Sequence, residues 1–165
     1  MGQYANGFPN GQGQYRWEIG AIYTGDFKDG MKHGKGKWKQ DQSIANSTQY
    51  EGEFKQDKKH GEGFFQWESG NSYKGMYEDN LRHGFGEMAW TDGSKYEGDW
   101  QFGAQHGFGK LTLSNGEVRE GVFKNNNFIG KIGEKDAEGK VIERPPQLQK
   151  KDAEPGLMEK DAEEM

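Results

Sequence analysis

Residues 50–72 read YEGEFKQDKKHGEGFFQWESGNS, and the next two stretches of equal length repeat this pattern. Residues 73–95 read YKGMYEDNLRHGFGEMAWTDGSK, and residues 96–118 read YEGDWQFGAQHGFGKLTLSNGEV. In each copy, tyrosine stands at position 1, glycine at positions 3, 14 and 21, an aromatic residue at position 5, and His-Gly at positions 11 and 12. A fixed period of this length predicts an array of stacked structural repeats.

The pattern continues in both directions with weaker matches. A copy that begins at Tyr23 is longer, because the loop around residues 41–48 is enlarged. The copies that begin near residues 1 and 119 lack both the opening tyrosine and the histidine. Atypical end copies suit a stacked array, since its outermost units face water on one side. We therefore predict an array over residues 1–132, with copies that start near residues 1, 23, 50, 73, 96 and 119.

The composition agrees with an array more than with a two-layer domain. Only 30% of the residues are hydrophobic and the mean hydropathy is -1.18, yet 13% are aromatic. Residues 133–165 depart from the pattern, and this charged segment contains KDAE three times. We predict that it is a disordered tail or a short helix.

Each copy contains two segments with strand periodicity. Positions 1–5 and positions 14–18 alternate between two kinds of side chain, as strands with one apolar face do. The polar stretch between them, with Gly, Asn or Asp at position 8 and His-Gly at positions 11 and 12, is interpreted as a turn. Further turn signals, such as Asp92-Gly93-Ser94, connect successive copies. The predicted fold is all-β: an elongated, twisted, single-layer antiparallel sheet of stacked β-hairpins.

The Tyr-x-Gly opening and the His-Gly-x-Gly centre resemble the repeat of the MORN family, and the resemblance covers residues 1–132. Structures of that family are elongated twisted antiparallel sheets. The resemblance implies a scaffold or adaptor in the cytoplasm, in a cytoskeletal or ciliary assembly such as a flagellar axoneme or radial spoke. It leaves two alternatives open, namely a peripheral phospholipid-binding tether and a regulatory subunit of an enzyme.

The sequence offers no arrangement that supports catalysis or a cofactor. All four histidines occupy position 11 of successive copies, at His33, His60, His83 and His106. Equivalent residues of stacked hairpins lie about 10 Å apart, whereas zinc holds its ligands at about 2 Å. There is no cysteine, and the carboxylates recur at strand spacing. We therefore expect no enzyme activity, no metal and no cofactor.

One face of the sheet should carry positions 1, 3, 5, 14, 16 and 18, and hence most of the rings. Long surfaces rich in Tyr and Trp are typical of protein interfaces. We hypothesise that a helix or an extended peptide lies in this aromatic groove, and that other subunits add at the edges of the sheet. The residues predicted to contact the partner are Tyr50, Phe54, Phe65, Trp67, Tyr73, Tyr77, Trp90, Tyr96 and Trp100.

Two further surfaces are candidates for binding. Apolar residues interrupt the opposite, polar face at Phe64, Met76, Phe85 and Phe108. A cluster of lysines could contact lipid headgroups or an acidic protein, and it comprises Lys28, Lys32, Lys35, Lys37, Lys39, Lys55, Lys58 and Lys59. The net charge of -5 argues against a nucleic-acid partner. Protein docking is the main prediction, and a membrane is the alternative.

Overall fold

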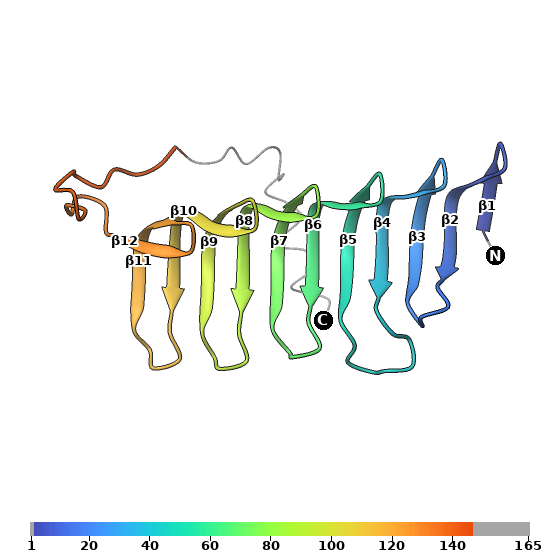
Figure 1. The fold of residues 1–165 in the computed structure, drawn as a ribbon, viewed down its shortest axis with the longest axis horizontal. Coiled ribbons are helices and arrows are strands. Elements are labelled where there is room, and N and C mark those ends of the chain that lie inside the picture. Colours follow the sequence, from blue (N-terminus) through green and yellow to red (C-terminus); the bar gives the residue numbers. More distant parts are fainter. Residues whose placement is uncertain (1, 147–165) are drawn as a thin grey trace, which may run out of the picture.

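A computed structural model describes residues 2–146 as one open antiparallel sheet of twelve strands. The order of the strands in the sheet is their order in the sequence (Figure 1). The strands are β1 (Gly2–Ala5), β2 (Phe8–Arg16), β3 (Ile22–Lys28), β4 (Met31–Lys39), β5 (Gln49–Lys55), β6 (Lys58–Gln66), β7 (Ser72–Glu78), β8 (Leu81–Ala89), β9 (Lys95–Gln101), β10 (Ala104–Thr112), β11 (Val118–Lys124) and β12 (Asn127–Gly130). The prediction of a single-layer, all-β sheet of hairpins is confirmed.

Each odd-numbered strand and the even-numbered strand after it form a hairpin with a two-residue turn, and we number these hairpins as repeats 1 to 6. In repeat 4, φ is 48° at Asp79 and 70° at Asn80. Two consecutive positive φ angles are typical of the type I′ turn, which Asn, Asp and Gly adopt most readily. The turn thus occupies positions 7 and 8, and the prediction that His-Gly belongs to the turn is wrong.

The His-Gly pair lies instead in a bulge of the second strand. Gly75 pairs with Gly86 and Tyr77 pairs with Arg82, so β8 contains two more residues than β7 between these pairs. A bulge bends its strand and requires unusual backbone angles, which glycine adopts without steric cost. The glycine after each histidine has a positive φ in all four copies, at Gly34, Gly61, Gly84 and Gly107.

The core is a continuous row of aromatic rings. The position-1 tyrosines are at most 1% exposed, and they are Tyr23, Tyr50, Tyr73 and Tyr96. The ring of Tyr73 packs edge to face against Tyr77 of its own repeat, with centroids 5.2 Å apart, and against Trp100 of the next repeat, with centroids 5.4 Å apart. Equivalent contacts extend from Phe27 to Phe123. Each tyrosine therefore joins two repeats, and the array has one shared core.

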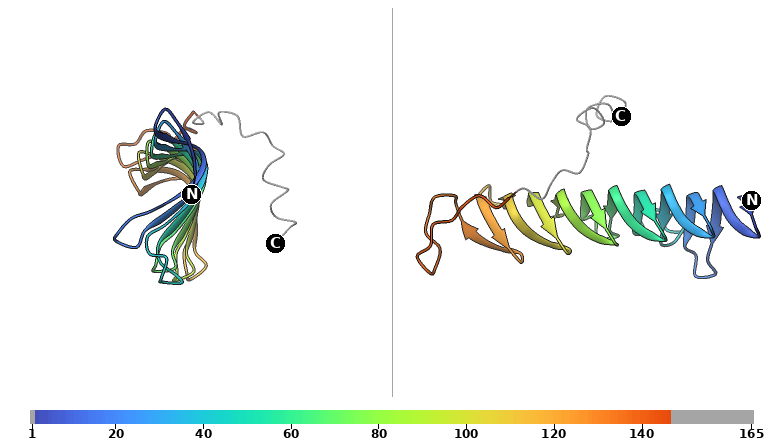
Figure 2. Two further views of the ribbon diagram at one scale, coloured as in Figure 1. Left: turned by 90° about the vertical axis from the view of Figure 1, so that its right-hand side faces the viewer. Right: turned by 90° about the horizontal axis from the view of Figure 1, so that it is seen from above.

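Glycines at positions 3 and 14 lie beneath each tyrosine ring. A Cβ added to Gly75 would lie 2.4 Å from the Cα of Gly86, and one added to Gly86 would lie 2.2 Å from the Tyr73 hydroxyl oxygen. That hydroxyl donates a hydrogen bond of 2.9 Å to the Met76 carbonyl. The glycines therefore leave the space that the tyrosine rings occupy. Because Cβ directions converge on this face, the sheet curls toward it, and the end-on view in Figure 2 shows the resulting crescent.

Neighbouring hairpins are also joined at their turns. The amide of Asn80 donates to the Lys59 carbonyl at 3.0 Å, and the Asn80 Oδ1 accepts from the Lys59 amide at 2.8 Å. Asp57 makes the same pair of bonds to Lys32, and Asn126 makes it to Gln105. An Asx residue at position 8 thus serves two purposes, since it tolerates positive φ and also bonds the preceding repeat.

The segment that follows β12 differs from the prediction of a disordered or helical tail. Lys135 and Val141 form a β-bridge, and the Asp136 carboxylate accepts hydrogen bonds from the amides of Glu138 and Lys140. Ile142 is buried beside Gly130. The high charge of the segment led to the prediction of disorder or a helix. The structure has a local turn instead, which places an apolar side chain against the last hairpin. Residues 147–165, the remainder of the predicted tail, lie outside the described residues.

Candidate functional site: the concave aromatic face

The concave face of the crescent carries the aromatic rings, and it divides them into two layers. Six of the nine residues predicted to contact a partner are buried by their neighbours, namely Tyr50, Phe54, Tyr73, Tyr77, Tyr96 and Trp100. Their rings fill the inner layer, where edge-to-face packing covers them. The assignment of these six to a partner surface is therefore corrected, because they form the core of the array itself.

The outer layer contains the other three predicted contact residues, Phe65, Trp67 and Trp90. They are half-buried and pack against the inner rings, so one side of each ring stays open to solvent. Two residues that were not predicted, Trp17 and Trp38, belong to the same layer. We call these five residues, Trp17, Trp38, Phe65, Trp67 and Trp90, the aromatic stripe.

The strands and the loops between repeats position the aromatic stripe. Phe65 is at position 16, in β6, and its ring lies 4.6 Å from that of Trp67 between centroids. Trp67 and Trp90 stand at position 18, where each backbone amide closes the loop to the next repeat by donating to Asn71 and Ser94, respectively. These bonds hold the backbone of each tryptophan in place and leave its indole side chain at the surface.

A row of cations lies beside the aromatic stripe on the same face. Position 10 carries Lys32 in repeat 2, Lys59 in repeat 3 and Arg82 in repeat 4, and we call these three the cation row. The Lys59 Nζ lies 5.4 Å from the ring centroid of Phe65, and the Arg82 Cζ lies 4.5 Å from that of Trp100. Such distances allow cation–π attraction. Sequence reasoning missed this row, since it assigned position 10 to a turn.

Burial changes the acid–base properties of two members of the cation row. Loss of hydration lowers the pKa of Lys59, and the charge of Lys32 lowers it further. Loss of hydration also lowers the pKa of Arg82, although Tyr77 and Tyr73 oppose this effect. Both groups still lie close to rings and at the surface, so they combine a charge with reduced solvation. A carboxylate that approached them would meet less competition from water.

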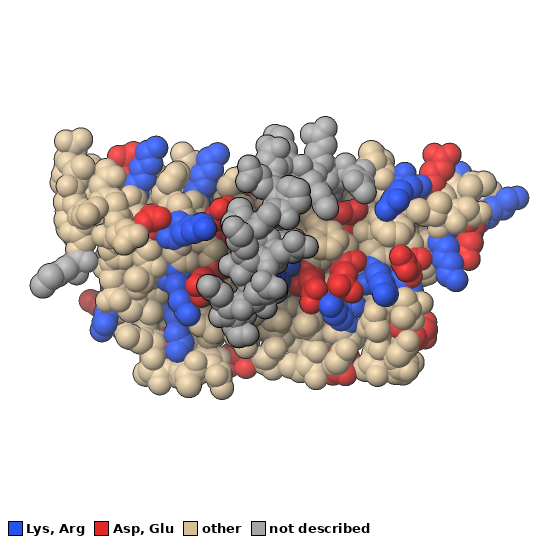
Figure 3. Space-filling view, turned by 180° about the vertical axis from the view of Figure 1, so that it is seen from behind, with Lys and Arg blue, Asp and Glu red and all other residues tan. Residues whose placement is uncertain are grey.

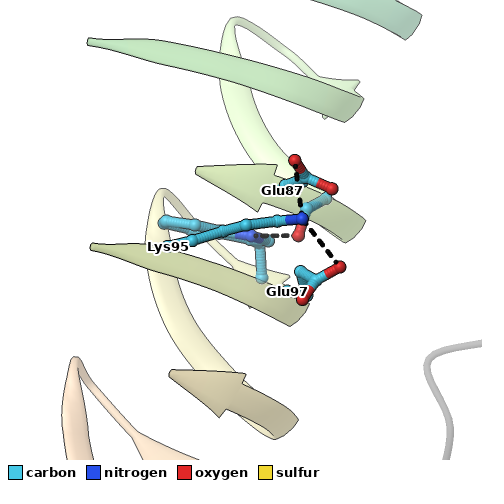
Figure 4. A network of polar contacts seen from close by, with 5 residues as sticks. Glu87, Lys95 and Glu97 are labelled. Atoms are coloured by element: carbon cyan, nitrogen blue, oxygen red, sulfur yellow. Dashed lines mark hydrogen bonds and ion pairs between the residues drawn. The ribbon is translucent and has the colours of Figure 1, made fainter. Parts of the chain in front are cut away.

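The opposite, convex face carries charges that neutralise one another (Figure 3). Glu87 and Glu97 face each other across the β8–β9 ladder, and the Lys95 ammonium lies 3.2 Å from the first carboxylate and 3.1 Å from the second (Figure 4). Partial burial opposes protonation of Lys95, but hydrogen bonds to Glu97 and Glu87 raise its pKa overall. Lys37 pairs with Glu51 at 3.4 Å on the same face. Two clusters of opposite charge on the convex face are thus paired within the protein.

The second predicted apolar patch lies on the convex face. Phe64 is 40% exposed and Phe85 is 45% exposed, while Met76 and Phe108 are half-buried. The Arg144 guanidinium lies over the Phe108 ring, 4.8 Å from its centroid. The C-terminal segment therefore covers the end of this patch, and its use by a partner stays a prediction.

The eight clustered lysines do not form one surface. Lys32 and Lys59 lie on the concave face, whereas Lys35 and Lys37 lie on the convex face. Lys28, Lys55 and Lys58 flank hairpin turns, and the Lys39 Nζ donates to the Ala45 carbonyl in the long loop. The prediction grouped these lysines because they are close in the sequence. Side chains alternate along a strand, so neighbouring lysines lie on opposite faces of the sheet.

Two of the four histidines have polar partners within the protein. His83 Nε2 lies 3.3 Å from the Glu78 carboxylate, and His106 Nδ1 accepts a hydrogen bond from the Asn125 amide of the next repeat. Among residues 2–146, no three His, Cys, Asp or Glu side chains are grouped as metal ligands. Within the same residues, no helix is long and apolar enough to cross a membrane.

Comparison with known proteins identifies the repeat. The family model described as MORN repeat matches residues 1–22, 23–41, 50–72, 73–95 and 96–118. A search of curated proteins found no match. MORN repeats are typically non-catalytic, and the matched residues contain the tyrosine, glycine and His-Gly positions that build each hairpin. Since these matches cover more than half of the sequence, the chain belongs to the MORN repeat family.

Proposed function

We propose that this protein is a non-catalytic scaffold that docks a protein partner on its concave aromatic face. The observation that carries the proposal is the aromatic stripe, a set of Trp and Phe side chains that pack on the core and that residues 2–146 leave partly exposed. Tryptophan anchors contribute strongly to protein interfaces, because a large ring gains contact area and loses few rotamers.

The charge distribution favours a protein partner over a lipid surface. The lysines predicted as a lipid contact are divided between two faces and the turns, and two of them are paired, Lys37 with Glu51 and Lys39 with the Ala45 carbonyl. A peripheral lipid-binding protein usually concentrates basic residues on one surface, whereas the net charge here is -5. The family resemblance extends the proposal to a cytoskeletal or ciliary assembly.

Site-specific photo-crosslinking tests the docking surface. A benzophenone amino acid is placed at Trp67 on the concave face, and in a matched variant at Phe64 on the convex face. Both sites carry an aromatic side chain in or next to β6, so the two variants differ mainly in the face that they report. After irradiation in the cells that make the protein, we expect a discrete protein adduct from position 67 and little or none from position 64.

Adducts from position 64 alone would place the partner on the convex patch and contradict the proposal. Fractionation of the same cells supplies an independent measurement. A scaffold in a cytoskeletal or ciliary assembly should remain with the detergent-resistant, salt-stable fraction. Recovery on floating membranes, with release by salt, would support the phospholipid-tether alternative instead.

A further inference from the structure

The cation row adds chemical selectivity to the docking surface, in an inference that rests on the proposed function. We infer that the concave face binds an acidic segment of a partner protein, with carboxylates that meet Lys32, Lys59 and Arg82 and apolar side chains that meet the aromatic stripe. Cations and rings alternate along one face, so a complementary segment needs both kinds of side chain.

The cation row is left without carboxylate partners in the part of the chain that the structure describes. The ion pairs found between lysine or arginine and acids within residues 2–146 involve Lys37, Lys95 and Arg119. Arg82 Nη2 donates to the Gly103 carbonyl at 2.9 Å, and Arg82 Nη1 donates to the Met88 Sδ at 3.8 Å. An arginine has five N–H donors and a lysine has three, so most of the donors of the row are available to a ligand.

The repeat sets the spacing of the expected carboxylates. Consecutive members of the row are one repeat, or two strands, apart, which is about 10 Å at a strand separation of about 4.8 Å. A peptide in the polyproline II conformation has three residues per turn and advances about 3.1 Å per residue, so acids at every third residue would lie on one side, about 9 Å apart, and would meet the row in register. A helix would need an acid about every seventh residue, since its rise is about 1.5 Å per residue.

The residue type at position 10 also makes the two ends of the concave face chemically different. The cations of repeats 2 to 4 are followed by Gln105 in repeat 5 and by Phe128 in repeat 6. The latter ring packs against Phe123, with centroids 5.2 Å apart. The acidic part of the ligand should therefore lie over repeats 2 to 4, and a neutral, apolar part should extend over repeats 5 and 6.

The curvature of the sheet argues for a peptide more than for a membrane. The cation row lies on the inner side of the crescent, and its charged groups rest on rings. A peptide can lie along this concave surface, whereas a flat bilayer would not follow a sheet that is curved in the end-on view (Figure 2). The ligand expected from this spacing is therefore a single polypeptide chain that lies along the concave face.

The test uses a phage-displayed library of random 15-residue peptides, which are long enough, when extended, to cover about 50 Å. The full-length protein is panned alongside a triple variant, Lys32→Gln, Lys59→Gln and Arg82→Gln. A matched control, Lys37→Gln, Lys74→Gln and Lys110→Gln, removes the same charge from the convex face. The selected peptides are then synthesised, together with versions in which Gln replaces Glu and Asn replaces Asp, and their Kd values are measured at low salt.

We expect selected peptides with acids at every third residue and apolar residues between them. Their binding should weaken about 30-fold in the triple variant and by a similar factor after neutralisation of the peptide, because each of three partly dehydrated pairs contributes about threefold. The convex control should bind as the wild-type protein does. The neutralised peptides keep the test valid even where the triple variant folds poorly.

Other results would overturn the inference in distinguishable ways. Neutral apolar peptides that bind all three proteins equally would refute charge selection and leave docking on the concave face intact. Peptides whose binding survives Trp67→Ala and Trp90→Ala would refute both the selection and the proposed surface. Phosphatidylserine vesicles that bind the wild-type protein and not the triple variant would show that the row serves a membrane.

Discussion

At the scale of the residue, one contact recurs through the array: a tyrosine ring lies on two facing glycines. In repeat 4 the Tyr73 ring covers Gly75 and Gly86, and its hydroxyl reaches the Met76 carbonyl. The contact positions the inner rings, and they in turn support the aromatic stripe. A hydroxyl at the end of a rigid ring also satisfies a carbonyl that would otherwise be buried without a partner.

Crowding beneath the tyrosine ring predicts different losses of stability for two Gly→Ala substitutions. Gly86→Ala should lower the free energy of unfolding by about 3 kcal/mol, because its Cβ would lie within 2.2 Å of the Tyr73 hydroxyl oxygen. Gly93→Ala should cost about 1 kcal/mol, because it meets no atom within 4 Å and only has to adopt a φ of 90°. Urea unfolding of both variants measures the difference. Equal costs would contradict the steric role of Gly86, since a positive φ applies only to Gly93.

The buried tyrosines also predict a loss of stability in alkali. Burial raises the pKa of the Tyr50, Tyr73 and Tyr96 hydroxyls well above their usual value of 10.0. Above pH 10 the unfolded chain loses these protons and the folded chain keeps them, so the folded state is disfavoured as the pH rises. The free energy of unfolding should change little between pH 8 and pH 9 and should then fall by up to about 1.4 kcal/mol per pH unit for each tyrosine.

Urea unfolding between pH 8 and pH 11.5 measures this slope, and absorbance at 295 nm reports the ionisation of tyrosine. Ionisation of all seven tyrosines near pH 10 in the folded protein would contradict the burial of the inner layer.

The sequence predicted single residues well where the repeat constrains them and poorly near the turn. The period placed the glycines of positions 3 and 14 on the same face as the rings, where the structure has them. Arg82 was missed because the turn was assumed to extend to position 12. With the turn at Asp79 and Asn80, the alternation of β8 continues back to position 10 and places Arg82 on the aromatic face. The burial of Tyr73 depends on Trp100 of the next repeat, a contact between repeats that sequence spacing does not reveal.

At the scale of the element, the hairpin turn does more than reverse the chain. Asn80 holds a positive φ and also joins repeat 4 to Lys59 of repeat 3 through two hydrogen bonds. In repeat 5 the equivalent residue is Gly103, which lacks a side chain, and the Arg82 guanidinium bonds its carbonyl. The order of the six hairpins was predictable from the period, whereas the two-residue turn became clear only from the backbone angles.

Substitutions of Asn80 can separate the two roles of the turn residue. Asn80→Asp should change the free energy of unfolding by less than about 0.5 kcal/mol, because aspartate keeps the acceptor, as Asp57 does. Asn80→Gly should cost about 1 kcal/mol through loss of the acceptor alone. Asn80→Ala should cost about 2 kcal/mol, since it also strains the backbone. Thermal and urea unfolding provide the measurements, and an equal loss for Gly and Ala would exclude backbone strain.

At the scale of the whole molecule, the array is nearly one-dimensional. Each hairpin pairs with the hairpins on either side, and the rings bridge the same neighbours. Stability in such arrays is approximately a sum of terms for each repeat and for each junction. The first strand, β1, has four residues and exposed side chains, so it contributes little to the stability of the N-terminal end.

Hydrogen exchange should therefore vary along the molecule. We expect the slowest amide exchange in β5 to β9, where each buried tyrosine has two ring neighbours, and the fastest in β1. Peptide-resolved mass spectrometry measures the profile. Tyr73→Ala should accelerate exchange most in repeats 3 to 5 and less in repeat 1. A uniform rate across the array, with a uniform response to the substitution, would indicate all-or-none unfolding and contradict this model.

The sequential order of the strands also bears on how the protein is made. Translation releases about 5–20 residues each second, so one repeat of the regular length leaves the ribosome in roughly one to five seconds. A β-hairpin forms in about 1–10 μs. Each new hairpin can therefore close on the edge of its predecessor long before the next one is synthesised, and the array can grow during translation without waiting for any distant part of the chain.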